Sequence, residues 1–150
     1  MPDEVAGEPQ LSTEETRAVA EMLDSISVGG IEIDMAFYGE GENPTFMLAS
    51  YSNIPPGVPP EGLLRGAGGG IIGAGGTADV EDIQTRARGA ITYSCIPFSG
   101  KLFPTDSASA DGLACVWAEG EDIWLLMDLT TTAIDSAVDH ADSIHLSLAS

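Results

Sequence analysis

The sequence predicts a single α+β domain, in which N- and C-terminal helices cover one face of an antiparallel sheet of about five strands. Three observations support this prediction. Apolar residues make up 43% of the 150 residues, which is enough for one core, and the length suits one compact domain. Apolar runs of strand length pair into two hairpins around short turns. Amphipathic helical patterns lie near both ends of the chain.

The N-terminal segment is read in two parts. Residues 1–11 are polar and acidic, and we expect a flexible lead ahead of a domain over residues 12–150. Ser12 followed by Glu15 has the spacing of a capping box. Apolar residues at helical spacing come next, until a glycine pair ends the pattern. We therefore expect a first helix near residues 13–27.

The first hairpin is predicted from a change in apolar patterning. Residues 31–37 alternate apolar and acidic side chains, which is typical of a half-buried strand, whereas residues 45–51 are almost continuously apolar. A proline-rich run at 55–60 then breaks the chain. Residues 61–78 contain eight glycines, and two interpretations stay open: a short helix packed closely against the sheet, or a mobile loop.

The second half of the chain predicts further strands. Residues 80–96 suit one or two strands, and residues 97–112 read as a long polar loop. A second hairpin is expected between residues 113–118 and 123–129, around an acidic turn that contains glycine. The sheet is therefore expected to be antiparallel throughout.

The C-terminal end predicts a second helix. Thr132 is placed to act as its N-cap, with Asp135 at the third position. Apolar residues recur at helical spacing from Ile134 to Ile144 and run toward Leu148. The predicted helix is therefore amphipathic, with one face for the sheet and one for solvent.

The charge excludes several classes of partner. There are 24 acidic and 5 basic residues, a formal net charge of −19. Such a surface repels phosphate backbones and anionic lipids, so nucleic-acid binding and docking on a membrane surface are disfavoured. No apolar run approaches the roughly 20 residues of a membrane-spanning helix. The start of the chain has no signal-peptide pattern, so we expect either a cytosolic protein or a piece from which an export signal or anchor was removed.

No motif in the chain predicts catalysis, a cofactor or a metal. Residues 68–73 fit GxGxxG but do not follow a strand, as a dinucleotide-binding turn requires. His140 and His145 are five residues apart, whereas zinc-binding helices place histidines three or four apart. The scattered acids do not match the spacing of an EF-hand loop, and Ser99 has no GxSxG frame. We therefore predict a non-enzymatic protein without a cofactor or metal site.

Two residue pairs are the remaining candidates for special roles. Cys95 and Cys115 form either a disulfide that closes a loop of about 20 residues or a pair of buried thiols. Trp117 and Trp124 are expected to face each other across the second hairpin. They either pack beneath the helices or form an aromatic surface for a partner.

The sequence around the cysteines resembles a known group of domains. Ile91-Thr92-Tyr93-Ser94-Cys95 is followed by a loop of small residues and then by Cys115-Val116-Trp117-Ala118-Glu119. This frame resembles that of extracytoplasmic domains of actinobacterial membrane proteins and lipoproteins, in which an Asp stands where this chain has Glu119. The resemblance covers roughly residues 30–147. It implies a disulfide between Cys95 and Cys115, export from the cytoplasm, and an anchor upstream of the chain.

Three functional hypotheses follow. The leading one is a non-enzymatic, extracytoplasmic domain that binds an unidentified partner protein or a small ligand at the cell envelope. The second is a self-associating structural subunit of a surface assembly, because an almost continuously apolar strand with few lysines can pair at a sheet edge. The third is a cytosolic, acidic domain of halophile type with free thiols, since high salt screens self-repulsion.

Overall fold

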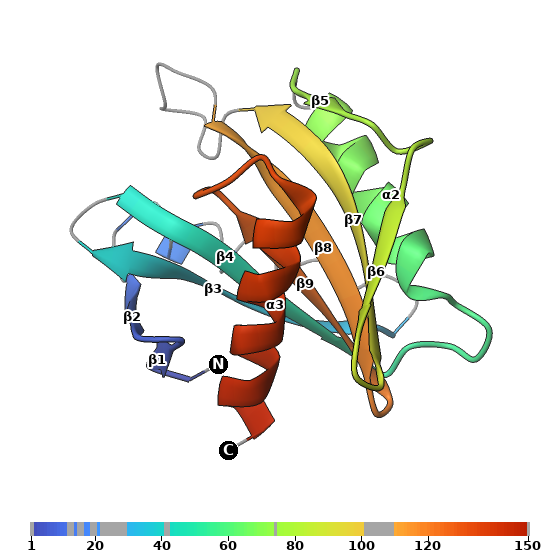
Figure 1. Ribbon diagram of the computed structural model, residues 1–150, viewed down its shortest axis with the longest axis horizontal. Coiled ribbons are helices and arrows are strands. Elements are labelled where there is room, and N and C mark those ends of the chain that lie inside the picture. The colour runs from blue at the N-terminus through green and yellow to red at the C-terminus, as the bar shows by residue number, and fades with distance from the viewer. Residues whose placement is uncertain are drawn as a thin grey trace.

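The computed structural model describes residues 2–11, 14, 17–18, 21, 30–40, 43–73, 75–100 and 110–149. Within them the chain forms one antiparallel sheet of nine strands, in the order β1-β2-β3-β4-β9-β8-β7-β5, with β6 also paired to β7 (Figure 1). The strands are β1 (Glu4–Val5), β2 (Glu8–Leu11), β3 (Glu32–Glu40), β4 (Asn43–Ser52), β5 (Thr77–Ala78), β6 (Gln84–Arg88), β7 (Ile91–Gly100), β8 (Ala110–Glu119) and β9 (Asp122–Asp128).

The two predicted hairpins are both confirmed. β3 pairs with β4 in a register that sets Phe37 opposite Met47, and β8 pairs with β9 so that Trp117 lies opposite Trp124. Gly120 begins the two-residue loop of the second hairpin with a φ of +65°. A positive φ at the first loop residue is the requirement of a type II′ turn, which glycine meets without strain.

Helix α3 (Ile134–Ala149) covers one face of the sheet (Figure 1). Its buried face, which includes Val138 and Ile144, packs on a core that contains Tyr38, Tyr93 and Trp117. The N-cap position is Ala133, one residue later than predicted, because the Ala133 carbonyl accepts the first helical hydrogen bond, from the Ala137 N–H, and the Thr131 hydroxyl accepts a hydrogen bond from the Ala133 N–H before the helix begins. The amphipathic pattern in the sequence therefore predicted this helix, but not its capping residue.

A row of polar contacts also holds α3 against the sheet. Asp135 bonds to Arg86 at 3.2 Å, Asp139 bonds to Arg88 at 3.3 Å, and the Tyr93 hydroxyl donates to the Asp142 carboxylate at 2.9 Å. The three carboxylates are spaced four and three residues apart, so they share one side of the helix. The two arginine pairs are largely exposed, and each contributes only about 0–1 kcal/mol.

Helix α2 (Pro60–Gly73) lies on the opposite face of the sheet and answers the question left open for residues 61–78. Leu64, on the side of this helix that faces the sheet, is fully buried within a core that includes Ile96 and Leu125. A methyl group at Gly68 would lie 2.4 Å from Val80 Cγ1, so only glycine lets the helix approach this closely. Here the low helix propensity of glycine is offset by tertiary packing.

The described structure corrects three predictions. The sheet has nine strands rather than about five. The expected lead at residues 1–11 instead forms β1 and β2, which pair with each other and with β3 while Val5 and Leu11 are buried. β7 and β8 also extend into the predicted loop at 97–112.

These strands were missed because they are too short or too polar to show a pattern. β1, β2 and β5 have two to four residues each, and pairing with longer neighbours forms them. The expected helix near 13–27 lies largely outside the described residues, as do residues 101–109 of the expected loop. None of the helices in the described ranges is long and apolar enough to span a membrane.

Candidate binding groove

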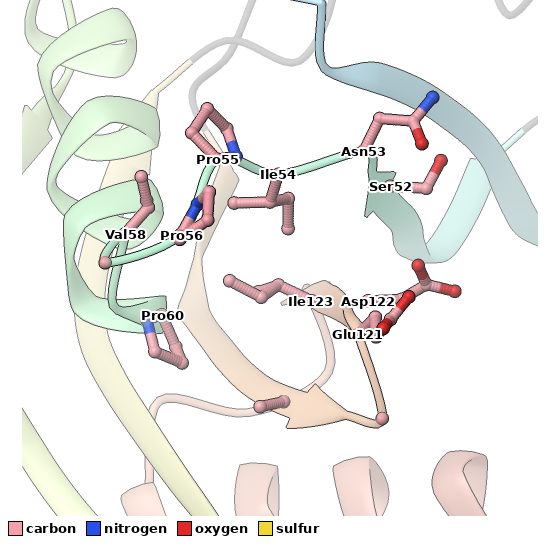
Figure 2. A pocket seen from close by; sticks show the side chains of 13 residues that line it. Ser52, Asn53, Ile54, Pro55, Pro56, Val58, Pro60, Glu121, Asp122 and Ile123 are labelled. Carbon is pink, nitrogen blue, oxygen red and sulfur yellow. The ribbon is translucent and has the colours of Figure 1, made fainter.

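An open groove lies at the end of the sheet where β4 leaves it and where β8 turns into β9. Its cavity measures about 740 Å³. One wall is the connection from Ser52 to Pro60 that leads into α2, and the other is the β8–β9 turn from Ala118 to Ile123 (Figure 2). The groove is therefore built from two segments that are some sixty residues apart in the chain and meet because β4 and β9 are neighbours.

The shape of the first wall is fixed by its sequence. Asn53 has a φ of +56° and Gly57 a φ of +89°, values that asparagine and glycine tolerate better than other residues. Between and beyond them, Pro55, Pro56 and Pro60 restrict the backbone further. A wall with this little conformational freedom loses little entropy when a ligand settles against it.

Ile54 and Ile123 form the apolar floor of the groove, and Figure 2 shows them lying next to each other across it. Ile123 is only 5% exposed and pairs with Tyr51 of β4, whereas Ile54 is half-buried against the core beneath α2. Burial raises the pKa of Tyr51 above its usual value of 10.0, so this hydroxyl stays neutral. The floor is therefore continuous with the folded core.

The end of the groove farthest from the prolines is acidic. Glu121 is exposed and Asp122 is half-exposed, and both side chains lie at the side of the groove away from the prolines (Figure 2). Across the described ranges, neither carboxylate has an ion-pair or hydrogen-bond partner among the side chains. An apolar wall and two available negative charges thus border the same cavity.

The predicted cysteine pair is joined in the structure. Cys95 and Cys115 lie directly opposite each other on β7 and β8, and their sulfur atoms are 2.13 Å apart. Both residues are fully buried beneath α3. The bridge is buried and neither cysteine lines the groove, which makes it part of the core rather than of a site.

Trp117 and Trp124 are opposite each other, as predicted, but they do not form a partner surface. Trp117 is fully buried, with its ring centroid 5.5 Å from that of Tyr93, and it cannot contact another protein. Trp124 is half-buried against the same core. The hypothesis of an aromatic partner surface is therefore wrong for Trp117, because α3 covers this face of the hairpin.

The other residues weighed from the sequence lie apart from one another. Residues 68–73 are inside α2 rather than at a turn between a strand and a helix, and Ser99 lies within β7. His145 Nδ1 is 2.5 Å from Glu119 Oε1, although the two groups are not aligned for a hydrogen bond. Among the described residues, the histidine, cysteine and acidic side chains form no group of three or more suited to a metal ion.

A histidine–aspartate contact that the sequence did not reveal joins β9 to α3. His140 Nδ1 lies 2.5 Å from Asp128 Oδ2, and Asp128 is 1% exposed. The other oxygen of Asp128 accepts hydrogen bonds from the backbone N–H and the hydroxyl of Thr130, at 2.9 Å and 2.6 Å. Because the Thr130 hydroxyl donates to this carboxylate, the cluster ties the β9–α3 connection together and does not present an activated nucleophile.

Comparison with protein-family models, with curated proteins and with solved structures found no match for this chain. The groove itself was not predicted from the sequence. In the sequence its proline-rich wall, which contains Pro55 and Pro56, indicates only a break between elements. The signal available was that a rigid loop follows β4 and an acidic hairpin turn precedes β9, two strands that become neighbours.

Proposed function

We propose that this protein is a non-enzymatic, extracytoplasmic domain that binds a segment of a partner protein at the cell envelope. The observation that carries the proposal is the groove between the 52–60 connection and the β8–β9 turn. A small-molecule site normally encloses most of its ligand. This cavity is partly open to solvent, which suits a segment of another protein lying in it.

The compartment is proposed on the basis of the cysteines. Disulfides persist in oxidising environments and are rare in the cytosol. Both cysteines of the chain are in the bridge between β7 and β8. An oxidising, extracytoplasmic location is compatible with this bridge, and it agrees with the resemblance of residues 91–95 and 115–119 to extracytoplasmic domains.

Self-association is less well supported than binding of another protein. That hypothesis rested on the apolar strand at residues 45–51 being available at a sheet edge. The strand is β4, which is paired on one side with β3 and on the other with β9. Its backbone groups are therefore not available to a second copy of the chain.

Site-specific cross-linking in the native host tests this function. A photoreactive benzoylphenylalanine is placed at Pro56 in the groove wall and, as the control, at Ser136, which is exposed on α3 on the opposite face of the sheet. We expect irradiation to give one adduct of defined mass from position 56 and none from position 136. Adducts of the same mass from both positions, or none from either, would contradict the proposal.

A further inference from the structure

We infer that the groove recognises a long cationic side chain, of lysine or arginine, carried by an extended segment of the partner. This inference rests on the proposed function and names the chemistry that the groove selects. Lysine and arginine combine an apolar stem with a charged end. The groove offers matching surfaces in the same order, with Ile54 and Ile123 on its floor and two carboxylates at one side (Figure 2).

The availability of the carboxylates is the first supporting observation. Many other acids near the described core already have partners: Asp128 bonds to Thr130 and His140, and Asp135 and Asp139 bond to arginines of β6. Glu121 and Asp122 have no such partner among the described side chains, and yet they border a cavity. They are therefore placed to receive a charge from outside the chain.

The apolar floor is the second observation, and it distinguishes this place from an ordinary acidic patch. The floor and the proline wall expose apolar atoms of Ile54, Pro56 and Val58 to the cavity. A small hydrated cation gains nothing from such atoms, whereas the methylene groups of a lysine or arginine side chain are removed from water against them. The pairing of apolar floor with acidic rim therefore favours a long basic side chain over a metal ion.

The charge of the whole chain supports the same partner. At a formal net charge of −19, the protein attracts a basic segment from a distance and repels acidic ones. Arg86 and Arg88, two of the five basic residues, are paired with acids of α3, on the other face of the sheet. They do not compete for the groove.

The test is an NMR titration of the ¹⁵N-labelled full chain with short blocked peptides of the form Gly-Ser-X-Ser-Gly, where X is lysine, arginine, norleucine or glutamate. We expect lysine and arginine peptides to shift the amide signals of Gly57, Gly120 and Ile123, and to bind more weakly as salt is added. Norleucine retains the apolar stem without the charge and should leave these signals nearly unmoved. Equal shifts with norleucine, or no shifts with lysine and arginine, would overturn the inference.

A matched pair of variants separates the groove from the general acidity of the surface. Glu121→Gln/Asp122→Asn removes both rim charges, whereas Glu81→Gln/Asp82→Asn makes the same change at an exposed acidic pair before β6. We expect the first variant to weaken binding of the lysine peptide by about threefold to tenfold, and the second to leave it almost unchanged. If both variants weaken binding of the lysine peptide equally, the effect is one of net charge and the inference is overturned.

Two further outcomes are decisive. If calcium alone shifts the signals of Glu121 and Asp122 and the lysine peptide does not, the groove end is a cation site and the inference is wrong. If the photoreactive residue at position 56 captures a partner but no basic peptide binds, the proposed function stands and only the ligand chemistry is overturned. If neither experiment succeeds, both proposals are wrong.

Discussion

The two faces of the sheet are held to their helices by different means. Beneath α3 the core contains large aromatic side chains and the disulfide, and a row of carboxylates bonds to β6 and β7. Beneath α2 the core is mostly aliphatic, with Phe37 and Phe98 as its buried aromatic members, and glycine brings the helix backbone close to the sheet. One face therefore depends on large side chains and polar partners, and the other on the lack of a side chain at Gly68.

The largest effect is expected from Trp117→Ala on the α3 face. Trp117 is fully buried, so its removal leaves a cavity and should cost about 3–5 kcal/mol of unfolding free energy. Trp124→Ala is the matched control on the opposite strand, and its half-buried ring should cost less. Urea unfolding followed by circular dichroism measures both. Equal losses for the two variants would show that α3 does not seal this face.

The next effect concerns the bridge between β7 and β8. We expect the double variant Cys95→Ala/Cys115→Ala to lose about 3 kcal/mol, the value for a closed loop of 20 residues. Reductant should destabilise the wild-type chain by a similar amount and leave the double variant unchanged. Intact mass after alkylation of the denatured chain gives an independent measure. Two alkylated thiols without prior reduction would refute the bridge.

On the α2 face the expected damage comes from adding atoms rather than from removing them. Gly68→Leu forces a side chain against Val80 and should cost about 1–3 kcal/mol. Gly69 is exposed and a Cβ there meets nothing within 4 Å, so Gly69→Ala should stabilise the helix by about 0.5–1 kcal/mol. Chemical unfolding of both variants decides the comparison. A tolerated leucine at position 68 would mean that α2 is not packed as closely as described.

The smallest effect is a pH dependence on the α3 face. Burial, and then the carboxylates of Asp34 and Asp3, raise the pKa of Tyr38 from 10.0 to about 12. The folded state holds this proton more tightly than the unfolded state, so the contribution to stability is complete below pH 10 and is lost as the pH rises to 12. This loss of stability is measured as a fall in melting temperature between pH 8 and 12.

Tyr38→Phe provides the comparison. It removes the 2.7 Å hydrogen bond from the Tyr38 hydroxyl to the carbonyl oxygen of Pro2 and should cost about 1 kcal/mol at neutral pH. Its melting temperature should then fall less steeply than that of the wild type above pH 10. If the melting temperatures of the two proteins fall in parallel above pH 10, the pKa of Tyr38 is not raised in the folded state.

The parts of the fold that were predictable are those with long, regular patterns. The alternation at residues 31–37 and the apolar run at 45–51 identified β3 and β4, and helical spacing after Thr132 identified α3. In each case the pattern extends over more than one turn or several strand residues. Local physics is then sufficient to determine the element.

The rest required tertiary information. β1 contains only two residues, and its Val5 is buried by contacts with the core that α3 covers. The helical state of residues 60–73 depends on close packing at Gly68, which single-residue propensity counts as a penalty. The candidate groove was missed for the same reason, because Ile54 and Ile123 become neighbours only through the pairing of β4 with β9.

The contact between β1 and α3 has a consequence for how this chain can be rearranged. The backbone N–H of Ala6 donates a hydrogen bond of 3.4 Å to the Ser147 hydroxyl, so segments near the two ends of the described chain touch. A short linker joining those ends, with new termini opened in the exposed turn at Gly89 and Ala90, would leave each helix and each strand pairing intact. Such a circular permutant would place its new termini at the same end of the sheet as the β8–β9 turn (Figure 1).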